Sequence, residues 1–144
     1  EKTTEDGTRR YVEMDAVLKH LINVYGLNGE VNGSASLLGE EYRIVSIFDN
    51  ILKNIYEKST QEPHIRCFAD ITEKDEVIEI SIRDTGSMIK DITRMFEPFY
   101  TTKKSGLGVG LFQAKNLVDS MGGTIQVRNI SQGVEFHISL PKHL

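Results

Sequence analysis

The sequence is poor in cysteine, tryptophan and proline: it has one cysteine (Cys67), no tryptophan and three prolines. A single cysteine excludes an internal disulfide and a multi-cysteine metal site, so we expect a reducing compartment. No apolar run approaches the ~20 residues that a membrane-spanning helix needs, and no signal peptide is visible. These absences predict a cytoplasmic chain.

A surplus of positive charge is also missing. The net charge is -4, so electrostatics provide no argument for a nucleic acid or an anionic membrane surface as partner. With 144 residues, of which 39% are hydrophobic and 26% charged, the chain has the size and composition of one globular domain. It begins at Glu1 rather than at a methionine, so we expect a piece of a longer protein.

Three segments have the apolar spacing of amphipathic helices, and they cover residues 14–26, 40–59 and 109–121. The first has a shared apolar face at Val17, Leu21 and Val24. The second has a longer one at Ile44, Ile47, Phe48, Ile51, Leu52 and Ile55. The third helix is predicted to end at a glycine pair, since glycine favours helix ends.

Alternating runs predict hairpins over residues 64–84 and 124–141, with a turn near Gln132 in the second. A short strand is expected over residues 9–14, and a turn-rich stretch over 26–36 has room for one more. Helices separated by antiparallel hairpins predict an α+β fold, a two-layer sandwich in which helices cover one face of the sheet.

Three glycines, Gly106, Gly108 and Gly110, stand at alternate positions before the third helix. The spacing fits neither a dinucleotide fingerprint, which would need a third glycine at Leu111 or Gln113, nor a P-loop. Without a Cβ, glycines let the backbone approach an anion, and a helix N-terminus offers unpaired N–H groups to phosphate. A flexible turn would also account for the three glycines, so this stretch alone leaves both phosphate binding and a flexible turn open.

Two further places carry chemistry. Asn50 and Asn54 lie one turn apart on the second helix, where their carboxamide oxygens could ligate Mg²⁺ or simply form a polar surface strip. Asp84 ends a strand before a tight turn at Gly86. Its carboxylate could accept a hydrogen bond from an exocyclic amine such as that of adenine, or belong to an ordinary Asp-x-Gly turn.

In this order the motifs resemble those of the catalytic ATP-binding domain of sensor histidine kinases, in the Bergerat-fold (GHKL) group. "DNILKNIYEKS" looks like the family's N-box, and "DTGSMI" looks like its Asp-x-Gly-x-Gly box. "FEPFYTTK" is similar to the F-box, and "GLGVGLFQAKNLVDSMGGTIQV" to the glycine box with its helix and following strand. The similarity runs from about residue 40 to the end.

The resemblance implies a mixed, mostly antiparallel sheet with about three helices on one face. Residues 1–10 would be a flexible lead-in from a dimerisation domain absent from the chain, and residues 11–144 the catalytic domain. The implied activity is two-component signalling: Mg-ATP binds, and its γ-phosphoryl group passes to a histidine of that dimerisation domain. A response regulator would act downstream, the isolated domain would be monomeric, and the parent protein could be anchored in the inner membrane.

By the same resemblance, Asn54 holds Mg²⁺, Asn50 lies beside it, and Asp84 reads the adenine amino group. Lys103 or its neighbour Lys104 reaches the γ-phosphate, or remains solvated charge of the ATP lid. Asn54, Asn50 and Lys103 are therefore the implied catalytic residues. The implied nucleotide contacts are those three together with Lys58, Asp84, Gly86, Ile89, Phe99, Thr102, Gly106, Leu107, Gly108, Val109, Gly110 and Leu111.

Two departures keep alternatives open. Hydrolysing relatives carry a glutamate where Asn50 stands, and a carboxamide cannot act as general base, so hydrolysis is disfavoured. Met88 replaces the second glycine of the Asp-x-Gly-x-Gly box, where a side chain could crowd the adenine pocket. A degenerate nucleotide-binding or protein-interaction module is therefore one alternative, and an anti-sigma-factor-type serine kinase another. His20 lacks the acidic neighbour of a phosphoacceptor, so we expect it on a helix surface.

Overall fold

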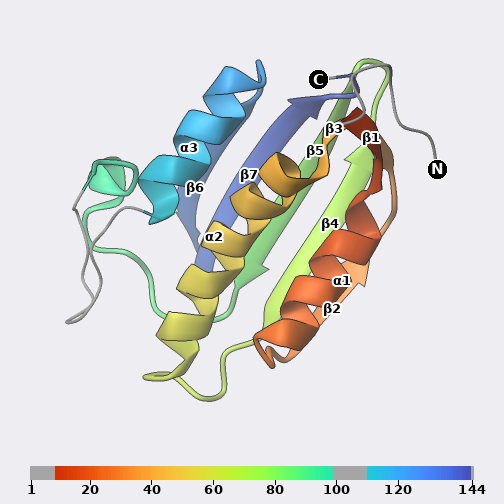
Figure 1. The fold of residues 1–144 in the computed structure, drawn as a ribbon. Helices are drawn as coiled ribbons and strands as arrows, with labels where there is room; N and C mark the ends of the chain where they lie inside the picture. The colour runs from red at the N-terminus through yellow and green to blue at the C-terminus, as the bar shows by residue number, and fades with distance from the viewer. Residues whose placement is uncertain (1–8, 99–109, 144) are drawn as a thin grey trace.

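A computed structural model of the chain describes residues 9–98 and 110–143. Figure 1 shows the elements that these residues form. In chain order they are β1 (Arg9–Glu13), α1 (Met14–Val24), β2 (Gly29–Asn32), β3 (Ser36–Glu40), α2 (Glu41–Ser59), β4 (Cys67–Glu73), β5 (Val77–Asp84), the 3₁₀ turn η1 (Ile92–Arg94), α3 (Gly110–Ser120), β6 (Thr124–Ile130) and β7 (Gly133–Pro141).

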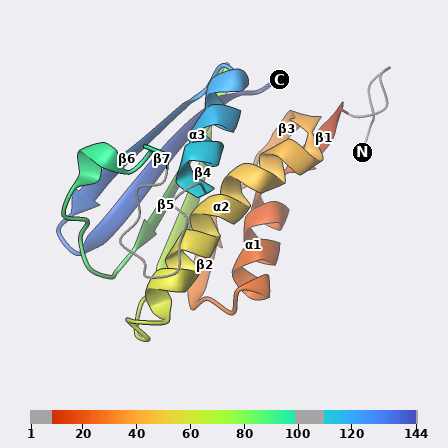
Figure 2. The same ribbon diagram turned by 60° about the vertical axis from the view of Figure 1, so that its left-hand side comes forward.

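The main sheet has five strands in the order β2-β4-β5-β7-β6. All neighbours are antiparallel except β2, which runs parallel to β4. The three helices lie on one face of this sheet, and Figure 2 shows them stacked on the same side from a second direction. The expected α+β two-layer sandwich is thus confirmed.

The core lies between α2 and the central strands. All six apolar residues predicted for α2 are 0–1% exposed. Alternate residues of β5 and β7 meet the helices, and the fully or almost fully buried ones are Ile78, Ile80, Ile82, Phe136, Ile138 and Leu140. Because α2 is held along its whole apolar face, the polar edge beside that face has a fixed position.

Cys67, the first residue of β4, belongs to the core. It is fully buried, and its Cα pairs with that of Asp84 across β4 and β5. Burial, and then the charge of Asp84, raises the pKa of the Cys67 thiol to about 12. The thiol therefore stays neutral at physiological pH.

The turn-rich stretch over residues 26–36 contains β2, the one further strand expected there. β2 joins the main sheet beside β4. β3 begins only at the last residue of that stretch and pairs with β1 in a separate antiparallel pair, which the sequence did not predict. Between β2 and β3 lies Gly33 with φ +85°, and a Cβ there would lie 2.2 Å from the carbonyl oxygen of Ile71. β3 is short and pairs with a strand more than twenty residues away, so local alternation did not reveal it.

Two other expectations need correction. Val24 was placed on the buried face of α1, but it is 58% exposed. It is the last residue of the helix, where burial depends on what lies opposite rather than on helical spacing. The lead-in was predicted to extend to residue 10, yet Arg9 and Arg10 already belong to β1, where they pair with Glu40 and Gly39 of β3.

Among the described residues, no helix is long and apolar enough to cross a membrane.

Candidate functional site

The polar edge of α2 carries Asn50, Asn54 and Lys58 at four-residue intervals, beside its buried apolar face. Residues spaced by four lie one above another on one side of a helix. Eight residues at 1.5 Å each separate the first from the last by about 12 Å. All three are partly exposed. At its Lys58 end this edge meets Asp84 and the turn that follows it, and at its Asn50 end it meets the start of α3.

At the Lys58 end lies Asp84, the last residue of β5 and only 3% exposed. The Lys58 Nζ lies 3.0 Å from Oδ1 and 3.2 Å from Oδ2 of Asp84. The backbone N–H of Gly86 donates to the same Oδ1 at 2.9 Å. The Asp84 carboxylate is therefore oriented by its own turn and by α2.

The turn after Asp84 is clamped by a residue just beyond α2. Glu62 accepts hydrogen bonds from the backbone N–H of Ser87 at 2.8 Å and from its hydroxyl at 2.6 Å. The Ser87 hydroxyl bond, assisted by the backbone bond and the charge of Lys58, lowers the pKa of Glu62 despite its partial burial. Lys58 also donates to the carbonyl oxygen of Ser87.

A second clamp comes from β6. The Asn129 side chain accepts from the backbone N–H of Ile89 at 2.8 Å and donates to the Ile89 carbonyl at 2.9 Å. Between the two clamps, Met88 is 58% exposed. Its side chain is therefore not packed into the core, and whether it crowds a bound adenine stays a question for the binding experiments.

Near Asp84 the chain is closely packed at two glycines, Gly86 and Gly133. A Cβ on Gly86 would lie 2.4 Å from Cδ1 of Ile65 and 2.8 Å from Cε of Lys58. Gly133, the first residue of β7, has φ +112°, and a Cβ there would lie 1.9 Å from the Asp84 carbonyl oxygen. At Gly133 the crowding atoms are backbone, so a side chain does not fit, whereas at Gly86 the neighbouring side chains would have to move.

At the Asn50 end, α3 begins at Gly110. A Cβ on Gly110 would lie 3.3 Å from Oδ1 of Asn50, so the end of the glycine motif abuts the N-box. The side chain of Leu111 is packed in the core, at 9% exposure, so the nucleotide contact predicted for this residue would have to come from its backbone N–H. Among the described residues, neither Asn50 nor Asn54 has a side-chain hydrogen-bond partner.

The structure thus gathers Asn50, Asn54, Lys58, Asp84, Gly86, Ile89 and Gly110 around one edge of α2. The other predicted contacts lie outside the described residues, namely Phe99, Thr102, Lys103, Gly106, Leu107, Gly108 and Val109. Glu62, Asn129 and Gly133 were missed by sequence reasoning. Only Gly133 carried a signal, as the glycine of a predicted turn; the other two contact partners 25 and 40 residues away.

The described residues contain no cluster of three histidine, cysteine or acidic side chains that could hold a metal. The amide oxygens of Asn50 and Asn54 fit a different requirement, because Mg²⁺ takes few protein ligands and completes its shell with water and phosphate. The residues present therefore suit a cation delivered with a nucleotide.

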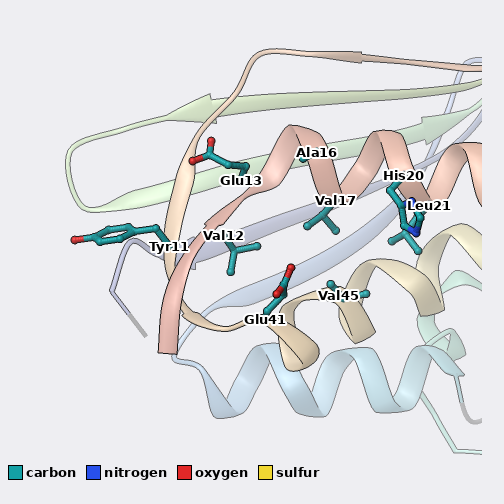
Figure 3. A pocket seen from close by; sticks show the side chains of 9 residues that line it. All are labelled: Tyr11, Val12, Glu13, Ala16, Val17, His20, Leu21, Glu41 and Val45. Carbon is teal, nitrogen blue, oxygen red and sulfur yellow. The ribbon is translucent and has the colours of Figure 1, made fainter. Parts of the chain in front are cut away.

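The hollow of Figure 3 lies elsewhere, between β1, α1 and the start of α2. Its α2 residue Val45 is about 20 Å along the helix from Lys58, at 1.5 Å per residue. Apolar side chains line it with Glu13, Glu41 and His20, and no lysine or arginine does. That lining does not suit a triphosphate. His20 is exposed there on α1, as expected.

A family described as histidine kinase-, DNA gyrase B- and HSP90-like ATPases matches residues 39–144. The chain is similar to the sensor protein FixL of Bradyrhizobium diazoefficiens, with 31% identity over 76% of this chain and 22% of FixL. It is also similar to the sensor histidine kinase WalK of Bacillus subtilis, with 32% identity over 71% of this chain and 18% of WalK. It therefore spans about a fifth of the length of these relatives.

The fold is similar to that of the mycobacterial sensor histidine kinase MprB. The TM-score is 0.79 at 23% identity, covering 94% of this chain and 98% of that one. At that identity the likeness concerns the arrangement of helices and strands.

Proposed function

Because the chain belongs to the family of histidine kinase-, DNA gyrase B- and HSP90-like ATPases, we propose that it is a kinase domain of two-component signalling. It binds Mg-ATP and passes the γ-phosphoryl group to a histidine on a partner dimerisation domain, for onward transfer to a response regulator. The similarity of two sensor proteins supports this assignment.

One observation carries the proposal: the C-terminal half of α2 lies beside a carboxylate at Lys58 and beside the N-terminus of α3 at Asn50. The Lys58–Asp84 contact and the Asn50–Gly110 contact are about 12 Å apart along the helix. That span suits a nucleoside triphosphate with its base at Asp84 and its phosphates at the start of α3, where the helix dipole favours anions.

Asn54 stands between these ends with its amide free among the described residues, and in the proposal it ligates Mg²⁺. Bound Mg²⁺ would neutralise phosphate charge. The chain's own residues position the triphosphate, which is the main requirement of phosphoryl transfer. Asn50 cannot take a proton from water, so hydrolysis is not promoted.

In the transfer, an imidazole nitrogen of the partner's histidine attacks the γ-phosphorus. A nitrogen–phosphorus bond forms, the bond to the β–γ bridging oxygen breaks, ADP leaves, and the imidazole proton passes to solvent. We assign Lys103, which lies outside the described residues, to the γ-phosphate. We also propose that the residues before β1 connect the chain to the dimerisation domain, in a cytoplasmic region of the parent protein.

Calorimetric titration of the chain with ATP, with and without Mg²⁺, tests binding. We expect Asp84→Asn to abolish binding, and Asn54→Ala to remove most of the gain in affinity from Mg²⁺. Asn23→Ala, an exposed asparagine on α1, is the matched control and should change nothing. No ATP binding by the folded wild-type chain would refute the proposal.

Transfer is tested by adding a helical dimerisation domain that contains an acceptor histidine, together with γ-labelled ATP. Label on that domain supports the kinase assignment. Intact ATP binding without transfer to any of several such domains would instead favour the degenerate nucleotide-binding module.

A further inference from the structure

The nucleobase end of the site holds a cation as well as a carboxylate. Lys58 is 17% exposed, and its Nζ contacts Oδ1 and Oδ2 of Asp84 and the carbonyl of Ser87. An ammonium group has three N–H donors, so these contacts engage all of them. Its stem packs against Gly86, where a Cβ would come within 2.8 Å of Cε. The ammonium is thus part of the wall around Asp84.

The two oxygens of Asp84 are not equally occupied. Oδ1 accepts from Lys58 at 3.0 Å and from the Gly86 N–H at 2.9 Å. Among the described residues, Oδ2 accepts only from Lys58, at the longer distance of 3.2 Å. A carboxylate oxygen has about two acceptor sites, so Oδ2 keeps one for a ligand N–H. The contact between Lys58 and Oδ2 is the weakest of the set.

We propose that Lys58 and Asp84 together read the six-position edge of a purine, with Lys58 as the residue that widens specificity to 6-oxopurines. This deepens the proposed function and depends on it. With adenine, Oδ2 accepts from the exocyclic amine while Lys58 turns one N–H to ring nitrogen N1. With a 6-oxopurine, Oδ2 accepts from N1–H while Lys58 donates to the carbonyl O6.

Both arrangements give the ligand N–H that faces Oδ2 an acceptor, and the ligand acceptor that faces Lys58 a donor. A carboxylate without the lysine would face the lone pairs of O6 and reject a 6-oxopurine, because an unpaired polar group in a binding site costs affinity. The pairing of Lys58 with Asp84 therefore predicts a site that discriminates poorly between the two kinds of base.

Inosine triphosphate (ITP) tests the discrimination between the two kinds of base, because it differs from ATP only in having a carbonyl and a protonated N1 at this edge. Calorimetric titration of the wild-type chain should give affinities for Mg-ATP and Mg-ITP within about tenfold, the equivalent of one hydrogen bond. Lys58→Met should weaken ITP at least about tenfold more than ATP. Lys58→Arg, which keeps the donors, should restore the wild-type ratio. Lys53→Met removes an exposed lysine of the same helix and should leave the ratio unchanged.

The comparison of Mg-ATP and Mg-ITP affinities uses the wild-type chain, so it tests the inference even if Lys58→Met does not fold. ATP binding with no ITP binding at millimolar concentration overturns this inference and leaves the proposed function intact. Equal weakening of both nucleotides in Lys58→Met shows a merely structural lysine and also overturns it. Failure of the folded chain to bind either nucleotide overturns both proposals.

Discussion

The two ends of the polar edge formed by Asn50, Asn54 and Lys58 on α2 differ in how completely their polar groups are paired. At the Lys58 end, Asp84 is buried and ion-paired, and hydrogen bonds with Glu62 and Asn129 hold the turn that follows it. At the Asn50 end, Asn50 and Asn54 have no side-chain hydrogen-bond partner among the described residues. There Gly110, at the start of α3, lies close to Asn50.

The paired groups at the Lys58 end and the unpaired amides at the Asn50 end would meet a ligand in two different ways. A paired, buried carboxylate is preorganised, because its orientation is determined before any ligand arrives. The amide oxygens of Asn50 and Asn54, which accept no hydrogen bond from the described residues, are instead available beside the N-terminus of α3 to a cation and phosphate that a ligand brings. We infer that the base end sets which nucleotide binds, and the open end meets its triphosphate.

The largest effect is expected from closing the space beside Asp84. Gly133→Ala adds a Cβ 1.9 Å from the Asp84 carbonyl oxygen at φ +112°. Overpacking and backbone strain together should cost about 3 kcal/mol of unfolding free energy, measured by urea denaturation. Gly26→Ala is the matched control, with φ +62° and nothing within 4 Å, so it should cost only about 1 kcal/mol. Equal losses in the two variants would show that crowding at Asp84 contributes nothing.

Loosening the clamp on the turn should have a moderate effect. Asn129→Ala removes both hydrogen bonds to the backbone of Ile89, which should cost about 1 kcal/mol of unfolding free energy and weaken ATP binding. Gln126→Ala, at an exposed position on the same strand, should alter neither. If ATP affinity is unchanged in Asn129→Ala, the clamp does not preorganise the base end.

At the open end, stability and binding should separate. Gly110→Ala adds a helix-favouring residue to α3, so unfolding free energy should change by less than about 1 kcal/mol. The new Cβ would lie 3.3 Å from Oδ1 of Asn50, and displacing that amide should weaken Mg-ATP binding about fivefold in calorimetry. Asn116→Ala, on the exposed side of α3, should stabilise the helix without changing affinity. A Gly110→Ala variant with unchanged affinity would place the phosphates elsewhere.

The smallest effect concerns pH. The Ser87 hydrogen bonds lower the pKa of Glu62 below its ordinary value of 4.5, so the ionised form is the stabilising one. Its contribution is present above that value and is lost as the pH falls through the lowered pKa. The difference in unfolding free energy between wild type and Glu62→Gln should be constant from neutral pH to about 5 and shrink below 4.5. A difference that stays constant in acid would refute this role.

Helical spacing alone predicted the apolar face of α2 and the shared side of Asn50 and Asn54, since 3.6 residues per turn is a property of the backbone. Alternation predicted both hairpins and placed Asp84 at the end of a strand. The type of each motif residue was likewise sufficient to suggest phosphate, metal and base contacts. These features depend only on neighbours within a few residues.

The tertiary structure decided what those residues touch. The pairing of Lys58 with Asp84 joins groups 26 residues apart, and that of Asn129 with Ile89 joins groups 40 apart. Gly110 meets Asn50 because α3 packs beside α2. No local period links such positions. They are brought together only when buried faces of distant elements pack on one sheet, and that packing determines which polar groups are paired and which stay free.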